Sequence, residues 1–233
     1  MKSIEEFDWP ALEEELATQG AAVLPGVFSD EEVNALTANA EAGVRSAKWR
    51  YLDLAQRGAG KIGQLPQPLS QQLLSLGDAL VLQLQPIARR WREIVRQIDL
   101  ERAEGTERAV IERNAIVDLT PNAEYSVLGV GDHILLRQGT EAAGGFEFEA
   151  TVLLSQPGVD FRGGELAIAE QRPRMQSRPM VVSLKKGDVA VFSSGARPFQ
   201  GAGGIYRVIL KNAVSRVREG QRAAVNLTFG KVS

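Results

Sequence analysis

The stretch of residues 146–170, FEFEATVLLSQPGVDFRGGELAIAE, most constrains how this chain can fold. Its first part alternates strictly, so that the odd positions 147–153 share one face and the even positions 146–152 share the other. This period of two predicts a β-strand. A turn at Pro157-Gly158 and a glycine pair follow, before a second apolar run over 165–169. Two strands joined by a wide turn predict a β-hairpin of a sandwich or barrel.

Short apolar stretches typical of strands recur on both sides of this hairpin. They lie at 114–117, 125–129, 132–137, 180–184, 189–192, 206–210 and 223–229. About eight short strands after a helical first part favour an α+β fold. We expect a double-stranded β-helix (a jelly-roll, cupin-like core) with N-terminal helices packed on one sheet.

The spacing of apolar residues before about residue 110 predicts mostly helix. Helices are expected over 4–19, after a capping box formed by Ser29 and Glu32, and over 70–97. Pro86 is expected to kink or split the long helix. A short buried strand is expected over 21–24, and the Gly-, Gln- and Pro-rich segment 56–68 predicts an irregular loop. We therefore expect one domain over 1–233, mainly helical over 1–110 and a jelly roll over 111–233.

Composition narrows the classes of function. A net charge of −2 and a pI near 5.7 argue against nucleic acid as a partner. No apolar run approaches the ~18 residues of a membrane span, and the first residues lack the apolar core of a signal peptide, so a cytoplasmic protein without a membrane partner is expected. The chain has no cysteine and one histidine, His133. Thiolate metal sites and any site that needs two histidines of this chain are therefore excluded.

Several segments resemble a known family in order and spacing. They are LLSQPGVDFRGGEL (153–166), EQRPRMQSRP (170–179), LKKGDVAVF (184–192), RPFQGAGGIYRV (197–208) and AVSRVREGQR (213–222), with a weaker match in GAAVLPGVFSDEEV (20–33). Together they resemble the 2-oxoglutarate/Fe(II) oxygenase superfamily, in its bacterial prolyl-hydroxylase-like branch. The resemblance implies a double-stranded β-helix, in agreement with the strand pattern.

The resemblance also implies an iron site made by a His-x-Asp pair and a later His. Counted from the hairpin, the pair falls on Arg137-Gln138-Gly139 and the later His on Gly195 or Ala196. None of these side chains is a usual iron ligand. We therefore expect no metal and no cofactor, with both iron and 2-oxoglutarate lost. Arg207 matches the arginine that binds the distal carboxylate of 2-oxoglutarate in relatives, or else it pairs with a glutamate of the hairpin.

The same resemblance implies that several charged side chains point into the barrel. By strand alternation His133 shares the inward face with Arg137, while Glu149 and Thr151, with Glu147, face them from the hairpin. Such clusters shift pKa values and can supply acid and base groups. The candidate catalytic residues are His133 as acid/base, Glu149 as its partner or a second base, and Arg137 as electrostatic stabiliser. The candidate substrate-binding residues are Arg207, Thr151 and Glu147.

Three functions remain open on this reasoning. The favoured one is a repurposed, metal-independent enzyme that performs non-oxidative acid/base chemistry (isomerisation, cyclisation, elimination or hydrolysis) on a small anionic metabolite. The second is a non-catalytic binding or regulatory pseudoenzyme, in which Arg137 fills the metal void and pairs with Glu149. The third is an oxygenase with a non-standard metal site built from His133 and a glutamate. A small-molecule ligand is expected in each case, and a homodimer is left open.

Overall fold

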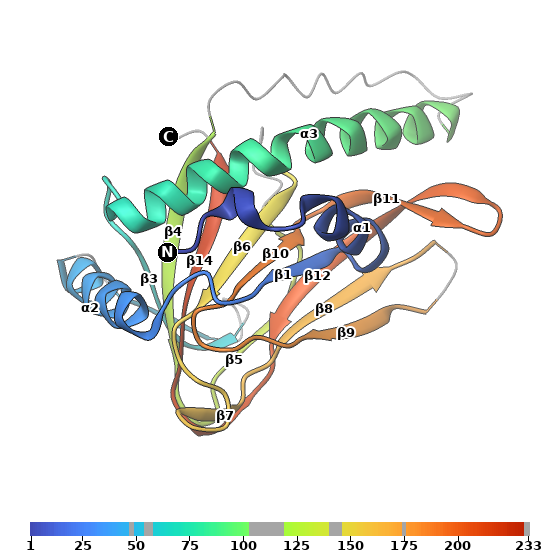
Figure 1. Ribbon diagram of the computed structural model, residues 1–233. Coiled ribbons are helices and arrows are strands. Elements are labelled where there is room, and N and C mark those ends of the chain that lie inside the picture. The colour runs from blue at the N-terminus through green and yellow to red at the C-terminus, as the bar shows by residue number, and fades with distance from the viewer. Residues whose placement is uncertain (47–48, 54–57, 103–118, 140–145, 174–175, 231–233) are drawn as a thin grey trace.

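The computed structural model describes residues 1–46, 49–53, 58–102, 119–139, 146–173 and 176–230 (Figure 1). Its helices are η1 (Ile4–Glu6), α1 (Trp9–Gln19), α2 (Asp30–Ser46) and α3 (Gln71–Arg102). Its strands are β1 (Ala21–Leu24), β2 (Arg50–Leu52), β3 (Gly58–Gln64), β4 (Thr120–Leu128), β5 (His133–Arg137), β6 (Phe148–Leu153), β7 (Phe161–Gly163), β8 (Leu166–Gln171), β9 (Arg178–Val182), β10 (Val189–Ser193), β11 (Ala196–Gly201), β12 (Gly204–Val214), β13 (Val217–Gly220) and β14 (Arg222–Gly230).

One antiparallel sheet runs through most of the chain and folds back on itself. Its strand order is β1-β10-β6-β14-β4-β3-β5-β12-β8-β9, while β11 pairs with β12 and β2 with β3. Strand β3 joins the two halves because it pairs with both β4 and β5. A separate two-stranded ribbon, β13-β7, lies at one end (Figure 1). The expected jelly-roll fold is confirmed, although β1, β2 and β3 come from the part expected to be mainly helical.

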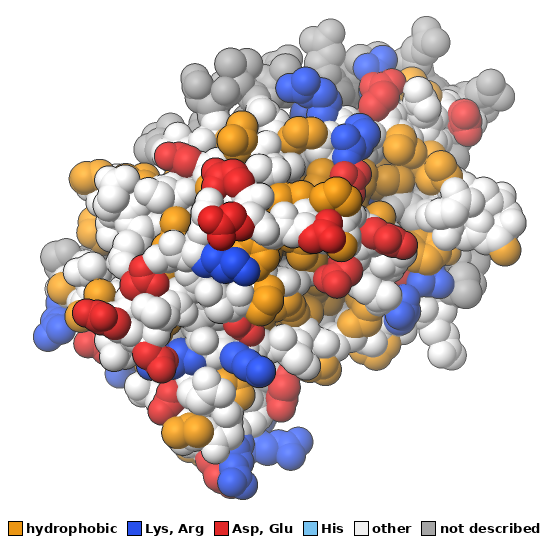
Figure 2. All heavy atoms as spheres, viewed as in Figure 1, with side chains coloured by type: hydrophobic (Ala, Val, Ile, Leu, Met, Phe, Trp, Pro, Cys, Tyr) orange, Lys and Arg blue, Asp and Glu red, His pale blue; other side chains and the backbone are white. Residues whose placement is uncertain are grey.

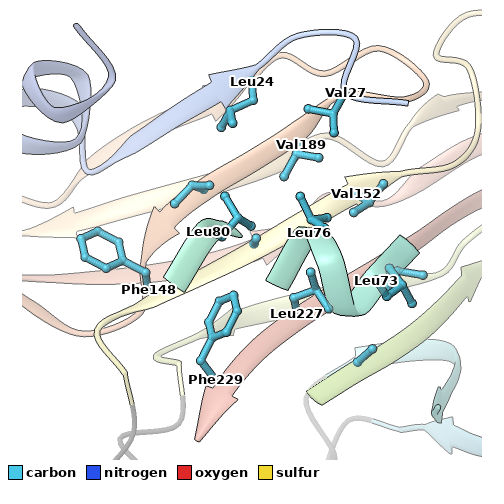
Figure 3. Packing of buried hydrophobic residues seen from close by; sticks show 14 of the residues in the cluster. Leu24, Val27, Leu73, Leu76, Leu80, Phe148, Val152, Val189, Leu227 and Phe229 are labelled. Carbon is cyan, nitrogen blue, oxygen red and sulfur yellow. The ribbon is translucent and has the colours of Figure 1, made fainter. Parts of the chain in front are cut away.

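Helix α3 covers the outer face of one half of the sheet (Figure 1). Leucines one turn apart, Leu73, Leu76 and Leu80, point onto that face (Figure 3). They meet the even-numbered residues Phe148 and Val152 of β6, together with residues of β10 and β14 (Figure 3). Within β6 the alternation is thus correct: the even positions join the apolar core under the helix, and the odd positions 149–153 face the barrel interior.

Two local expectations were wrong. Segment 56–68 contains the strand β3 instead of an irregular loop, because its glycines permit close backbone approach: a Cβ on Gly58 would lie 2.4 Å from the His133 carbonyl oxygen. Helix α3 runs unbroken through Pro86. The strand expected at 114–117 lies outside the described residues.

The capping box and the short strand expected near the N-terminus are both present. Ser29 and Glu32 form the predicted capping box: the Ser29 amide donates to Glu32 Oε2 at 2.9 Å, and the Glu32 amide donates to Ser29 Oγ at 3.3 Å. The strand expected over 21–24 is β1, which pairs with β10 at one edge of the sheet. No helix within the described ranges is long and apolar enough to cross a membrane. The single-domain assignment stays a prediction.

Candidate functional site

A small polar cavity lies between the two halves of the sheet. Its volume is about 30 Å³, room for about one water molecule. Its polar lining consists of Glu124, Ser126, Arg137, Thr151, Asn212, Arg222 and Asn226. Its apolar lining consists of Ile134, Leu166, Phe192, Val214 and Ala224. The cavity is therefore closed to any ligand larger than water until a side chain moves.

Arg137 and Asn212 face each other across β5 and β12, where they are register partners. Ala196 pairs with Ile209 on the same edge of β12, three residues before Asn212. Two residues that share one ligand must lie close together. The residue directly opposite residue 137 is therefore Asn212, and the sequence-based assignment to Gly195 or Ala196 stays a prediction.

His133 does not share the inward face with Arg137. Between the pairs Asn212–Arg137 and Val214–Ile134, β12 advances by two residues and β5 by three. The extra residue in β5 is a bulge, which reverses the alternation. Ile134 consequently lines the cavity beside Arg137, and His133 Nδ1 lies 3.3 Å from the Gly131 carbonyl oxygen. The proposed acid/base role of His133 has no support from this placement.

Glu149 is the buried carboxylate of the site, with 2% of its surface exposed. Its Oε2 lies 3.9 Å from Arg137 Nη2 and accepts a hydrogen bond from Asn226 Nδ2 at 3.3 Å. Burial raises the pKa of the Glu149 carboxyl above its ordinary value, and Arg137 and Asn226 offset only part of that shift. Glu149 is therefore a group that gains a proton more readily than an exposed glutamate does.

Thr151 lines the cavity itself, whereas Glu149 is linked to the cavity through its contacts with Arg137 and Asn226. The Thr151 hydroxyl donates to Asn226 Oδ1, and Thr151 and Asn226 are register partners on β6 and β14. Asn226 thus accepts from Thr151 with its oxygen and donates to Glu149 with its nitrogen. This chain of hydrogen bonds fixes the Glu149 carboxylate in one orientation.

Glu147 and Arg207 lie outside the cavity, so their expected roles in it are corrected. Glu147 precedes the first residue of β6 and accepts two hydrogen bonds from Arg92 of α3, at 2.6 and 2.8 Å. Arg207 Nη1 lies 3.7 Å from Asp99 Oδ1, also on α3. Both side chains hold the helix to the sheet.

Arg222 is the arginine that the barrel encloses. It is 2% exposed, at the start of β14, and no carboxylate or hydrogen-bond acceptor among the described residues pairs with its guanidinium. Burial lowers the pKa of Arg222 to about 10. An isolated buried charge is costly, so its retention points to an anion that binds there.

A sequence signal for Arg222 exists and was overlooked. In the strand read at 223–229, Val225 and Leu227 belong to the core under the helices, whereas Ala224 and Asn226 line the cavity. Extending this alternation by one residue at the start puts Arg222 on the inward face.

Glu170 and Arg172 have a structural role. Glu170, fully buried, accepts a hydrogen bond from Arg172 Nε at 2.6 Å and another from the buried Arg197. Arg197 also donates to the carbonyl oxygens of Ala17 and Thr18 at the end of α1. This network attaches α1 to β8 and β11.

A jelly roll with a polar cavity between its two sheet halves is the architecture of the 2-oxoglutarate/Fe(II) oxygenases. A Pseudomonas putida prolyl-4-hydroxylase superimposes with a TM-score of 0.60 at 14% identity, covering 97% of this chain and 100% of that one. The α-ketoglutarate-dependent carbocyclase SnoK of nogalamycin biosynthesis gives 0.62 at 13% identity, covering 99% and 86%. These likenesses establish the fold.

The chain belongs to the Oxygenase-NA family, described as oxygenases catalysing oxidative methylation of damaged DNA, whose model matches residues 60–232. An uncharacterised protein of Mycobacterium tuberculosis is 30% identical over 165 residues, which cover 70% of each chain. The superfamily indicated by the sequence segments is confirmed.

Family membership corrects the expectation that iron and 2-oxoglutarate have no part in this protein. The family is one of oxygenases, and the solved neighbours include proteins described as a 2OG-Fe(II) oxygenase and as α-ketoglutarate dependent. The described part of the chain nevertheless offers no group of three His, Cys, Asp or Glu side chains that could hold a metal, which also leaves the His133–glutamate metal site without support. The described residues of the site do not fit an iron ion.

Proposed function

We propose that this chain binds a small carboxylate inside the barrel at Arg222, and that Glu149 exchanges a proton with the bound molecule. The observation that carries the proposal is the burial of the Arg222 guanidinium without a counter-charge. Arginine is suited to this task because its planar fork can bind both oxygens of one carboxylate.

The charges around the cavity favour an anion. Arg137 and Arg222 bring two positive charges, and Glu149 brings one negative charge. Glu124 at the cavity edge is already paired with Arg50, at 3.4 Å. One carboxylate would balance the charges with Glu149 ionised, and a dicarboxylate would balance them with Glu149 protonated. Since the family is one of oxygenases and neighbours are α-ketoglutarate dependent, 2-oxoglutarate is the first ligand to test.

In the proposed chemistry, Glu149 in its ionised form removes a proton from the carbon next to the carbonyl of a bound 2-oxo acid. When a dicarboxylate binds, Glu149 first loses its own proton to solvent. The electron pair of that C–H bond moves into an enolate, which the arginines stabilise, and Glu149 returns the proton to carbon. In D₂O this cycle replaces carbon-bound hydrogen with deuterium. Arg137 is 27% exposed and spans from the interior to the surface, so it is the side chain whose movement would admit the ligand.

Calorimetry with 2-oxoglutarate tests the binding step. Arg222→Met should weaken binding about tenfold or more, since a charge-assisted hydrogen bond contributes about 1.5–3 kcal/mol. The matched controls Arg207→Met and His133→Ala should bind as the unaltered chain does. Binding that persists in Arg222→Met, or that is lost in Arg207→Met, would contradict the proposal.

Deuterium exchange followed by NMR tests the chemical step. We expect exchange at the carbon next to the carbonyl, and its loss in Glu149→Gln. A second candidate, non-catalytic binding, is favoured by the small cavity and by the pairing of Arg137 with Glu149. Binding that depends on Arg222 without any exchange would establish that second function.

A further inference from the structure

Asn212 interrupts the apolar inward face of β12. Alternate residues of this strand from Val208 onward are buried, and Leu210 and Val214 belong to apolar clusters. Asn212 lies between these two residues, is 6% exposed and lines the small interior cavity. An apolar side chain would match its neighbours, and burying an amide in their place costs free energy unless the amide finds a hydrogen-bond partner.

The Asn212 amide nitrogen has no such partner among the described residues, although it is buried. The other asparagine that lines the cavity differs in this respect, because Asn226 donates to Glu149 and accepts from Thr151. Buried polar groups are nearly always paired, and an unpaired donor costs the full penalty of its desolvation. The unpaired Asn212 donor therefore indicates that an acceptor atom enters the cavity from outside the chain.

The size and the donors of the cavity limit what that acceptor can be. A volume of about 30 Å³ has room for a group the size of one water molecule. Arg137, the register partner of Asn212, also lines the cavity and brings further N–H donors. A carbonyl oxygen is an acceptor alone and adds no proton to this set of donors. A hydroxyl group adds a proton, which then needs an acceptor of its own.

We infer that the Asn212 amide donates a hydrogen bond to the 2-oxo oxygen of the bound acid and so selects acids that carry a carbonyl group. The inference rests on the proposed function and adds the residue that recognises the oxo group. When Glu149 removes the proton from carbon, negative charge collects on this same oxygen as the enolate forms. A donor that is already in place stabilises that charge without reorganisation.

Calorimetry with 2-oxoglutarate and glutarate tests the inference on the intact protein. The two acids share both carboxylates, and glutarate has a CH₂ group where 2-oxoglutarate has the carbonyl. The unaltered chain should bind 2-oxoglutarate about tenfold more tightly, because with glutarate the buried donor stays unpaired. In Asn212→Val this preference should fall about tenfold, and the Kd for glutarate should stay within about threefold of its value in the unaltered chain. An unchanged preference in Asn212→Val would overturn the inference.

A matched control and a second variant complete the experiment. Asn34→Val, on the exposed surface of α2, should leave both affinities unchanged. Should Asn212→Val fail to fold, Asn212→Ala removes the same donor with a smaller side chain and should lose the same preference. Equal binding of the two acids to the unaltered chain, lost in Arg222→Met, would overturn the inference and leave the proposed function standing. Binding of neither acid would overturn both.

Discussion

The Glu149 carboxylate occupies the space beside Gly139 that a side chain at residue 139 would need. A Cβ on Gly139 would lie 2.2 Å from Glu149 Oε1 and 2.4 Å from Ser194 Cβ. The resemblance to iron oxygenases places an acidic residue of the metal site at this position. In this chain a carboxylate from the neighbouring strand β6 stands next to that position instead.

Gly139→Asp should destabilise the protein, because the new side chain overlaps Glu149 and places a second carboxylate against it. A loss of about 1–3 kcal/mol in the free energy of unfolding is expected for such overpacking. Urea unfolding of the single variant and of Gly139→Asp/Glu149→Ala provides the test. The double variant should recover part of the loss, and strictly additive effects would contradict the contact.

Arg222→Met should raise the free energy of unfolding of the ligand-free protein. Replacing a buried charge with an apolar side chain of similar volume is often stabilising, by about 1–4 kcal/mol. The increase is expected together with the loss of carboxylate binding. A large decrease in urea-denaturation midpoint would instead assign Arg222 a structural role.

The pKa of Glu149, raised by burial, gives a pH dependence of stability. The folded protein binds the Glu149 proton more tightly than the unfolded chain does. The contribution to stability is therefore fully present below the unfolded pKa and is lost as pH rises through the folded pKa. Because Glu149→Gln cannot ionise, its stability relative to the unaltered chain should increase over that pH interval. Parallel pH profiles of the two proteins in chemical denaturation would refute the assignment.

The buried pair of Glu170 and Arg197 should be far more sensitive to substitution than an exposed pair. Glu170→Gln removes the carboxylate that Arg197 and Arg172 share, which leaves a buried charge without a partner. The expected loss is about 3–5 kcal/mol in the free energy of unfolding. Glu219→Gln, in the exposed pair with Arg162, is the control and should change the melting temperature little. Equal effects of the two substitutions would contradict the network.

Damaged DNA, which the family description names, is not expected to bind tightly. The chain has 27 Lys and Arg against 29 Asp and Glu, and both signs are interspersed on the face in Figure 2. Affinity for DNA arises largely from clustered cations that displace counterions from phosphates. Fluorescence anisotropy with plain and alkylated duplexes should show no saturation at micromolar protein and physiological salt. Saturation that weakens steeply with added salt would contradict this prediction.

Much of the fold could be predicted from local pattern. The alternation over 146–153 and the helical spacing over 70–97 identified β6 and α3 because one face of each is buried. Strand β3 was missed because its glycines carry no side-chain pattern, and what places them in a strand is the close approach of β4 and β5. That information is tertiary and lies in other parts of the chain.

The site was less predictable than the fold because it too depends on details of the strands that local sequence does not mark. Thr151 and Arg137 line the cavity and Glu149 contacts Arg137, and these positions follow from the resemblance or from an unbroken strand. His133 was misplaced by a single extra residue in β5, which no local signal marks. Arg222 follows from alternation once β14 is known to begin at residue 222. Strand boundaries and bulges therefore limit how residue roles can be transferred between relatives.

The edge position of β1 bears on how this protein can be shortened in the laboratory. The family model matches from residue 60, which suggests a natural place to trim. A fragment that begins there would lack β1 and leave the backbone of β10 without its partner strand. Such a bare strand offers hydrogen-bonding groups to a second copy and promotes aggregation. A fragment intended for crystals or NMR should therefore begin ahead of Trp9, so that α1, β1 and the carbonyl partners of Arg197 are all retained.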